Sequence, residues 1–525
     1  MLDYLIEDAV VFDGSGNDGK VGRVGILDGK IVLDCTCEEA SQVIDAKGMI
    51  VAPGFIDVHG HSDLFAFIDP LRASKLCQGI TTEIGGQCGL SPAPVSEKHL
   101  EEFSGYYRSL GVPIYPNGKE LTSVGNLFDE LDSLNMGINM ALFTAHGTIR
   151  IAAMGLDPRP ADEEDIKMMG NIARDAVDAG ALGLSSGLMY APGSFASQQE
   201  LTRICEYLRG TGAIYTSHIR NQGNGLIESV RETLEIANDS GLRANVSHHK
   251  AVGRRNWGKV RATTEMIHLA GATSDVYPFE ASSTTLTATL PPSFFRQGME
   301  RVIARLSDQS FCHDLEESII HTTEEFDNDL LECGYDGILI ITASMTPDAI
   351  GCTIKQYAQK LGLSPFEAYV KLLLDNKGAV GDVCFSMSKS DVDYLVCDSD
   401  CMFGTDSLYV PQAMKMTHPR AIGTFTKILG EYVRDRKMLS MKQAIRWMTG
   451  LPADVYGFLS KGYVKEGFDA DLVVFNPDRI AANCTYTEPL LPNSGIEYVF
   501  VNGKLAVRNG LETGVRAGRV IRHRA

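Results

Sequence analysis

Repeated pairing of an amphipathic helix with a short strand constrains the fold of this chain more than any other feature. Apolar residues recur at helical spacing in three stretches, which start at Asp162, Gln198 and Leu226. Each stretch closes at or near a glycine, and a short run of small or β-branched residues follows it. Such units predict a parallel sheet with right-handed crossovers. A (β/α)8 TIM-like barrel is the version that collects side chains from the C-terminal ends of many strands at one site.

The two ends of the chain differ from this middle part. Both are rich in short strands and tight turns, and the pair Asn502-Gly503 predicts a β-hairpin. A chain of 525 residues exceeds what one core usually serves, and one late segment is too long for a βα loop. The expected parts are a small β-sandwich built from both termini, a hydrolase barrel, and a subdomain inserted into the barrel: residues 1–54 with 456–525, 55–455, and about 287–345.

Charge and composition exclude several classes of partner. The formal net charge of −19 and the pI near 5.1 argue against binding to nucleic acid or to an anionic membrane. The first residues lack a basic signal segment, and no apolar stretch is long enough to span a membrane. The cysteines follow neither a disulfide-scaffold nor a CxxC spacing. We expect a cytoplasmic protein with free thiols and a small-molecule substrate; the sequence leaves its oligomeric state open.

Four histidines stand where predicted strands end. His59 and His61 flank one residue after an apolar run. Because alternate residues of a strand point to one face, both rings can reach one ion, although two surface histidines are the alternative. His218 and His248 end consecutive predicted strands, as ligands around one centre require. His249 would point to the opposite side from His248.

One cysteine and one aspartate extend this set of metal-binding side chains. Cys88 lies in a glycine-rich turn, so its thiol can face a ligand, and a thiolate binds zinc strongly. With two histidines it makes a zinc shell that keeps a position open for water. Asp406 follows a predicted strand and, near a metal, can bind it and accept a proton from water. Taken singly, a packed core thiol is the commoner outcome for Cys88, and an Asx turn explains Asp406 equally well.

Further polar side chains are candidates for contacts with a substrate. Lys250 returns to the His248 side of its strand, and Arg220 stands two residues beyond His218. A buried tyrosine or a surface arginine is the commoner outcome for such residues taken singly. The other candidates are His146, Tyr190, Tyr277 and Arg420.

Taken in order along the chain, these motifs resemble the amidohydrolase superfamily and, within it, the N-acyl-D-amino-acid deacylase (D-aminoacylase) family. The segment GFIDVHGH is similar to the superfamily's first-strand metal motif, and GYVKEGFDADLVVFNP is similar to the strand that completes its small β-sandwich. The branch is indicated by GGQCG, SSGLMYAPG, SHIR, SHHK, DVYPFEASST, GTDS and HPRAIGTFTKILG. The strand ALGLSSGL lacks the metal-bridging lysine of many other members. The resemblance covers nearly the whole chain and is weakest in the insertion.

The resemblance implies zinc-dependent hydrolysis of the amide bond of an N-acyl-D-amino acid. Asp406 would be the catalytic base, and Arg420 would bind the carboxylate of the substrate. Lys250, Tyr190 and Tyr277 would orient the amide or the carboxylate. The ligands implied for one tight zinc site are Cys88, His218 and His248, and those for a weaker second site are His59, His61 and Asp406.

Proteins with other functions carry part of this pattern of motifs. A cyclic-amide hydrolase of the hydantoinase or dihydroorotase type has the same fold and chemistry, but Cys88 and the missing lysine disfavour it. A peptidase that acts on dipeptides containing a D-residue is a second alternative. A barrel used only for binding or assembly would have a decayed metal site, whereas every implied ligand is present.

Overall fold

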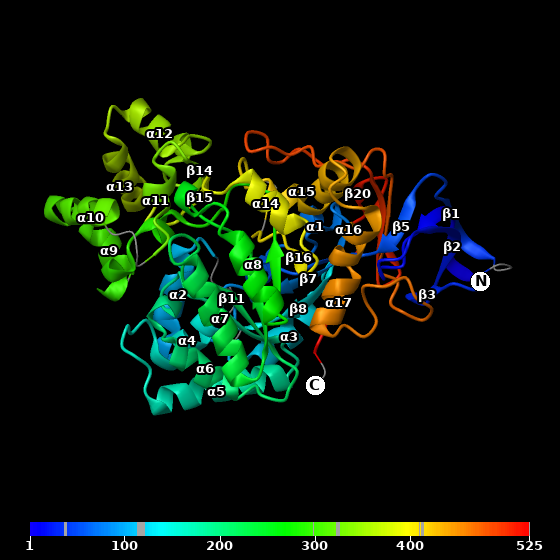
Figure 1. Ribbon diagram of the computed structural model, residues 1–525, viewed down its shortest axis with the longest axis horizontal. Helices are drawn as coiled ribbons and strands as arrows, with labels where there is room; N and C mark the ends of the chain where they lie inside the picture. Colours follow the sequence, from blue (N-terminus) through cyan, green and yellow to red (C-terminus); the bar gives the residue numbers. More distant parts are fainter. Residues whose placement is uncertain are drawn as a thin grey trace.

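The computed structural model has a central α/β part flanked by two smaller parts (Figure 1). A sheet with strands from both termini lies on one side, and a mostly helical part lies on the other. The residues described by the structure are 1–35, 39–112, 121–297, 299–321, 326–408, 410 and 414–523.

Parallel strands form the centre of the molecule in two sheets. The six-stranded sheet has, in spatial order, β16 (Cys401–Phe403), β13 (Thr273–Val276), β12 (Arg243–Val246), β11 (Ile214–His218), β10 (Gly183–Gly187) and β9 (Thr144–Ala145). The three-stranded sheet has β6 (Phe55–Asp57), β7 (Ile80–Gly85) and β8 (Asn139–Leu142). Backbone hydrogen bonds beyond the strand ladders join the two sheets, among them those from Val58 N–H to the Phe403 carbonyl (3.2 Å) and from Leu182 N–H to the Leu142 carbonyl (2.9 Å). The predicted parallel α/β fold is confirmed, whereas the strand ladders of the described residues do not close into one continuous sheet.

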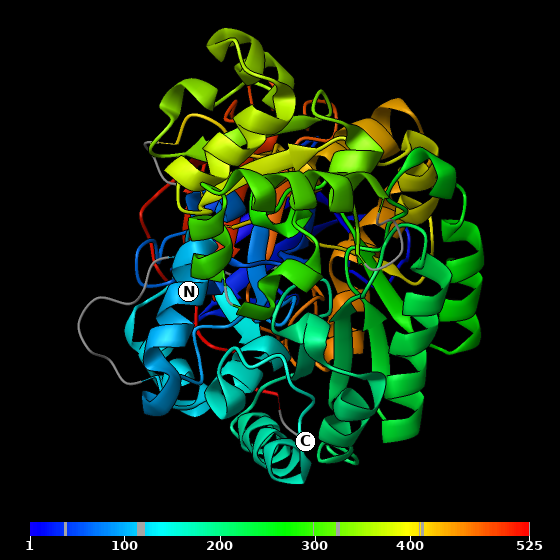
Figure 2. The ribbon, with the colours of Figure 1, turned by 90° about the vertical axis from the view of Figure 1, so that its left-hand side faces the viewer.

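Helices lie outside these strands (Figure 2). The three predicted helical stretches form α5 (Glu163–Asp178), α6 (Gln198–Glu206) and α7 (Leu226–Ser240). The Asp162 side chain accepts two backbone N–H groups of the first turn of α5 and so fixes its start. Gly241 ends α7 with a φ of 76°, a conformation that glycine adopts without strain. The remaining helices of this part are α1 (Ala73–Leu76), α2 (Leu100–Ser109), α3 (Val124–Ser133), α4 (His146–Met154), α8 (Val260–Leu269), α14 (Lys389–Val396), α15 (Arg420–Lys427), α16 (Met441–Met448) and α17 (Gly450–Tyr456).

A nine-stranded sheet draws its strands from both ends of the chain. In spatial order it has β20 (Leu511–Glu512), β19 (Lys504–Arg508), β18 (Ile496–Val501), β17 (Leu472–Phe475), β5 (Ile50–Pro53), β1 (Leu2–Val11), β2 (Lys20–Leu27) and β3 (Lys30–Val32), and β4 (Ala40–Asp45) pairs with β1. Asn502 and Gly503 turn β18 into β19 with φ angles of 47° and 77°, so the predicted hairpin is confirmed. Ile26 and Phe500, from opposite ends of the chain, share one hydrophobic core. The expected domain boundaries stay a prediction.

The mostly helical part has a hydrophobic core of its own. The buried residues of that core run from Leu286 to Cys384 and include Leu315 and Tyr369. The strands β14 (Ile338–Ala343) and β15 (Val380–Cys384) pair antiparallel within this part. Its helices are α9 (Met299–Arg305), α10 (Gln309–His321), α11 (Asp329–Cys333), α12 (Ile354–Leu361) and α13 (Pro365–Asp375). The insertion expected at about 287–345 lies within this stretch, and its limits stay a prediction.

The structure bears on two expectations from the sequence, which concern membrane-spanning helices and the oxidation state of the cysteines. Among the described residues, no helix is long and apolar enough to cross a membrane. The cysteines in the described part of the chain are all free thiols, as their irregular spacing predicts.

Candidate metal centre

Six buried side chains converge beyond the C-terminal ends of the parallel strands. Among the described residues, two overlapping sets bring one donor atom of each member within 4.8 Å of the donor atoms of the others. All the members of both sets are buried. One set is Cys88, His218 and His248, and the other is His59, His61, Cys88 and Asp406. The structure thus brings together all the residues that the sequence analysis expects to bind metal.

The direction of the strands explains this convergence. His218 ends β11, and the other five residues follow the C-terminal ends of β6, β7, β12 and β16. Because parallel strands point the same way, side chains just beyond these ends meet at one edge. Cys88, His248 and Asp406 have φ angles of 54°, 34° and 47°, a region that non-glycine residues rarely adopt. Strained backbone of this kind concentrates at functional sites.

The spacing of the donor atoms fits zinc. The Sγ atom of Cys88 lies 3.3 Å from His59 Nε2 and 3.4 Å from His248 Nε2. The donors of a tetrahedral zinc ion stand about 3.5 Å apart when the bonds are about 2.0–2.3 Å long. Both ring nitrogens of His218 are buried and have no hydrogen-bond partner among the described residues. Because buried polar atoms are normally paired, these nitrogens suit a ligand that comes from outside the chain.

The electrostatic surroundings of Cys88 favour the form that binds metal. Burial by itself would raise the pKa of the Cys88 thiol. The adjacent rings of His59 and then His248 outweigh burial and hold that pKa well below its usual value. A thiolate with imidazole nitrogens is a donor set that zinc prefers.

Two residues that the sequence analysis did not single out orient the histidines. Asp275 Oδ1 lies 3.1 Å from His59 Nδ1 and accepts a hydrogen bond from the backbone N–H of His248 (2.8 Å). The Nε2 atom of Gln222 lies 3.1 Å from His248 Nδ1. Partners of this kind fix the ring orientation of metal-binding histidines. Asp275 lies near the end of β13, and a carboxylate near a strand end is a pattern by which the sequence could have identified it as a candidate. The sequence around Gln222 shows no comparable pattern.

Asp406 lies between the paired histidines and an arginine. One carboxylate oxygen, Oδ1, is 3.2 Å from His61 Nε2 and 3.6 Å from His59 Nε2. The other, Oδ2, is 2.8 Å from Arg420 Nη1. Burial would raise the pKa of Asp406, but Arg420 and then His248 hold it well below its usual value. The carboxyl group is therefore ionised at neutral pH and can accept a proton.

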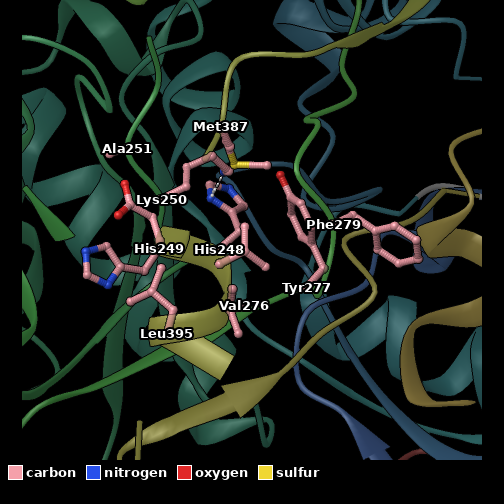
Figure 3. A pocket seen from close by; sticks show the side chains of 11 residues that line it. His248, His249, Lys250, Ala251, Val276, Tyr277, Phe279, Met387 and Leu395 are labelled. Atoms are coloured by element: carbon pink, nitrogen blue, oxygen red, sulfur yellow. Dashed lines mark hydrogen bonds between the residues drawn. The ribbon is translucent and has the colours of Figure 1, made fainter. Parts of the chain in front are cut away.

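A cavity of about 380 Å³ adjoins both sets of ligands, and Tyr190, Tyr277, Lys250 and Arg420 line it. The ring of Tyr277 packs against the Arg420 guanidinium, 4.6 Å from its centre. Lys250 Nζ lies 2.8 Å from His248 Nδ1 (Figure 3). The ring of His249 lies apart from that of His248, with Nε2 2.8 Å from the hydroxyl of Thr263 on α8. Four predicted substrate contacts thus face the same space as the metal ligands.

Comparison with known proteins establishes the family. The chain matches the model of the Amidohydrolase family over residues 42–315 and 398–507. The chain belongs to the amidohydrolase family. This amidohydrolase is 32% identical to an N-acyl-D-aspartate deacylase from Alcaligenes xylosoxydans xylosoxydans, over 99% of this chain and 95% of that protein. It is also 32% identical to an N-acyl-D-glutamate deacylase from the same organism, over 100% of this chain and 97% of that protein.

Solved structures place the amidohydrolase in the same branch. The crystal structure of an N-acyl-D-glutamate deacylase from Bordetella bronchiseptica matches it with a TM-score of 0.82 and 31% identity over 99% of each chain. That protein was complexed with zinc and a phosphonate inhibitor that mimics the tetrahedral intermediate of the reaction. A D-hydantoinase structure matches with a TM-score of 0.54 at 14% identity, over 100% of this chain and 99% of that chain, which shows a shared fold alone. The predicted membership of the N-acyl-D-amino-acid deacylases is confirmed.

Two residues that the sequence predicts to contact the substrate do not line the cavity of the amidohydrolase. The Arg220 guanidinium pairs with Glu232 (2.8 Å) and donates to the Ser194 and Ala196 carbonyls. His146 is buried, with Nε2 3.3 Å from Glu200 Oε1. Neither residue lines the cavity. Both side chains have polar partners within the fold, and their contact with a substrate stays a prediction.

Proposed function

We propose that this protein hydrolyses the amide bond of N-acyl-D-amino acids and releases a carboxylate and a free D-amino acid. The observation that carries the proposal is the shared cavity, in which Cys88 and two histidines adjoin an ionised carboxylate and a buried arginine. The relatives that match the whole chain are named as deacylases of N-acyl-D-amino acids. A linear amide, and not a cyclic one, is therefore the proposed substrate.

The proposed cofactor is zinc, with one tight site and a weaker second site. Cys88, His218 and His248 would hold the tight site, because a thiolate and two imidazoles satisfy zinc and leave a position open. The carboxylate of Asp406 and the rings of His59 and His61 would form the weaker site. When bound, zinc supplies a Lewis acid that activates a water and polarises the carbonyl of the amide.

Asp406 is the proposed proton carrier. Its carboxylate would accept a proton from the attacking water as the new C–O bond forms, and would deliver that proton to the nitrogen as the C–N bond breaks. The His61 ring at Oδ1 and the Arg420 guanidinium at Oδ2 hold this carboxylate ionised and fixed in direction. One residue would thus serve as base and then as acid.

Arg420 is the proposed anchor for the substrate carboxylate. Its Nη1 lies 2.8 Å from Asp406 Oδ2 but has no partner with hydrogen-bond geometry among the described residues. Its Nη2 donates to the Ser283 carbonyl (3.0 Å), which fixes the plane of the guanidinium. An N–H group of this guanidinium, beside the base, can grip a carboxylate and set the distance from the α-carbon to the reacting amide. Lys250, Tyr190 and Tyr277 would complete the contacts.

The proposal also covers the architecture and the cellular location of the protein. The parallel strands would form one (β/α)8 barrel, with the sheet of both termini as its β-sandwich. A cytoplasmic location stays a prediction.

The activity is tested by measuring free amine released from N-acetyl-D- and N-acetyl-L-amino acids, with added zinc or with a chelator. Zinc-dependent release from D-substrates alone supports the proposal, and no release from any linear amide by the zinc-loaded protein overturns it.

A further inference from the structure

One wall of the cavity carries two buried carboxyl groups that the proposed reaction does not use. Asp327 and Asp329 both line the cavity, although each is only 3% exposed. Asp327 accepts the backbone N–H groups of Gln222 (2.8 Å) and Gly223 (3.0 Å), so it also fixes the loop after β11. Asp329 begins α11. We call Asp327 and Asp329 the acidic wall.

One carboxylate oxygen of Asp329 lacks a partner, although the side chain also interacts with the Cys384 thiol. Its Oδ1 atom is buried and has no hydrogen-bond partner among the described residues. Asp382, whose charge acts on Asp329, has an Oδ2 atom that is likewise buried and without a partner in the described part of the chain. Burial, and then the charge of Asp382, raise the pKa of Asp329 to about 7. An unpaired buried carboxyl group is costly to the fold and suits a ligand that supplies a counter-charge.

The cations that line the cavity are already engaged. Among the described lining residues they are Lys250 and Arg420, apart from the histidines. Lys250 Nζ lies 2.8 Å from His248 Nδ1 and 3.4 Å from Gln222 Oε1. Arg420 lies beside Asp406. Lys250 is near enough to lower the pKa of Asp329, but in the described part of the chain neither cation forms an ion pair with Asp327 or Asp329.

We propose that the acidic wall binds a positively charged group of the substrate, with Asp329 as its direct partner. This inference rests on the proposed function, because it concerns the same cavity. The charge can lie on the side chain of the D-residue, as in N-acetyl-D-lysine, or on the acyl group, as in glycyl-D-leucine. Both place an ammonium group in the cavity, and the buried carboxylate recognises that chemistry in either position.

The inference separates this protein from relatives named for acidic substrates. A second carboxylate on the substrate, such as that of D-aspartate or D-glutamate, would face Asp327 and Asp329. Like charges brought together in a buried site destabilise a complex strongly. An N-acyl-D-glutamate should therefore be a poor substrate here, although proteins 32% identical to this chain are named for N-acyl-D-aspartate and N-acyl-D-glutamate.

The test compares matched substrate pairs on the zinc-loaded, full-length protein. One pair is N-acetyl-D-lysine and N-acetyl-D-norleucine, and the other is glycyl-D-leucine and N-propionyl-D-leucine; N-acetyl-D-glutamate is the acidic reference. The expected result is a kcat/KM higher by about tenfold or more for the charged member of at least one pair. The pair that shows the preference identifies the position of the charge.

A variant assigns that preference to the acidic wall. Asp329→Asn should reduce the ratio of kcat/KM within the responding pair by about tenfold or more. Glu332→Gln is the matched control: it removes a carboxylate from the same helix, where Glu332 pairs with Arg255 (3.0 Å) and does not line the cavity. This control should keep the wild-type ratio. The wild-type ratios alone decide the question if Asp329→Asn does not fold.

The possible outcomes are distinct. Hydrolysis of D-substrates with no preference for a cationic member, or with N-acetyl-D-glutamate as the best substrate, overturns the inference and leaves the proposed function standing. A preference that persists unchanged in Asp329→Asn also overturns it. If no D-substrate is hydrolysed, the proposed function fails, and the inference fails with it.

Discussion

The Nη1 atom of Arg420 lies 2.8 Å from Oδ2 of Asp406. The group proposed to hold the substrate carboxylate therefore touches the group proposed to move the proton. Binding of a substrate carboxylate at Arg420 would share the guanidinium between two carboxylates, which loosens its hold on Asp406 and makes that group a stronger base. Substrate binding and proton transfer are thus coupled through one contact.

Replacement of Asp406 by asparagine should abolish turnover but keep zinc. The amide cannot accept a proton, whereas Cys88, His218 and His248 are unchanged, so kcat should fall by about 10²–10⁴-fold or more. Activity and metal content are measured on the same preparation. Asp400→Asn, at a half-exposed carboxylate (47%), is the control and should behave like the wild type. Full activity in Asp406→Asn would contradict the assignment.

Replacement of Cys88 by serine should remove the tight zinc. A hydroxyl is a much weaker ligand than a thiolate, so zinc affinity should fall by more than the roughly 10–100-fold that loss of an outer-shell partner costs. Metal analysis after dialysis measures this loss. Cys397→Ser changes a free thiol that belongs to neither set of ligands and should retain zinc. If Cys88→Ser kept a full equivalent of zinc after dialysis, Cys88 would not be a ligand.

Replacement of Arg420 by glutamine should weaken binding of the substrate carboxylate. Loss of a desolvated charge pair costs about 2 kcal/mol or more, which is roughly thirtyfold in kcat/KM. The control is a substrate whose α-carboxylate is replaced by a carboxamide. Wild-type and variant proteins should differ much less on that substrate. An equal loss on both substrates would show that Arg420 acts mainly through Asp406.

The stability of the fold should depend on the charge of Asp382. Burial raises the pKa of Asp382 in the folded protein to about 7, from an ordinary value of 3.8. A raised pKa means that the folded state binds the proton more tightly, so this contribution to stability is full below about pH 4 and is lost as the pH rises towards 7. Asp382→Asn should therefore gain thermal stability over the wild type as the pH rises from 5 to 8.

Thermal unfolding at several pH values checks this prediction. Asp336→Asn, which changes an exposed carboxylate paired with Lys355, is the control and should show no such trend. A difference in melting temperature between Asp382→Asn and the wild type that stays constant from pH 5 to 8 would contradict the raised pKa.

Local patterns were enough to predict most of the central fold. The apolar stripe after Asp162, its capping side chain and the glycine after α7 act within a few residues, so the sequence displays them directly. His218 and Cys88 could be identified as candidates because strand ends and glycine-rich turns are visible in the chain. Their meeting at one edge follows from the parallel order of the strands.

Contacts between distant segments could not be predicted in this way. Arg220 is a candidate substrate-binding cation in the sequence, and its ion pair with Glu232 is visible only in the fold. Asp275 and His59 are far apart in the sequence, and their contact exists only in the folded chain. The acidic wall likewise forms only where the segment that contains Asp327 meets the loop after β11. Such relationships depend on tertiary packing, which no local spacing encodes.

The most direct test of the account is a zinc titration of the metal-free protein, with hydrolysis of one N-acetyl-D-amino acid and its L-enantiomer as the readout. The account predicts no activity without metal and a rise to a plateau near one equivalent of zinc, for the D-enantiomer only, because Cys88, His218 and His248 form one tight site. Equal hydrolysis of both enantiomers, activity in the metal-free protein, or no hydrolysis at any zinc level would contradict it.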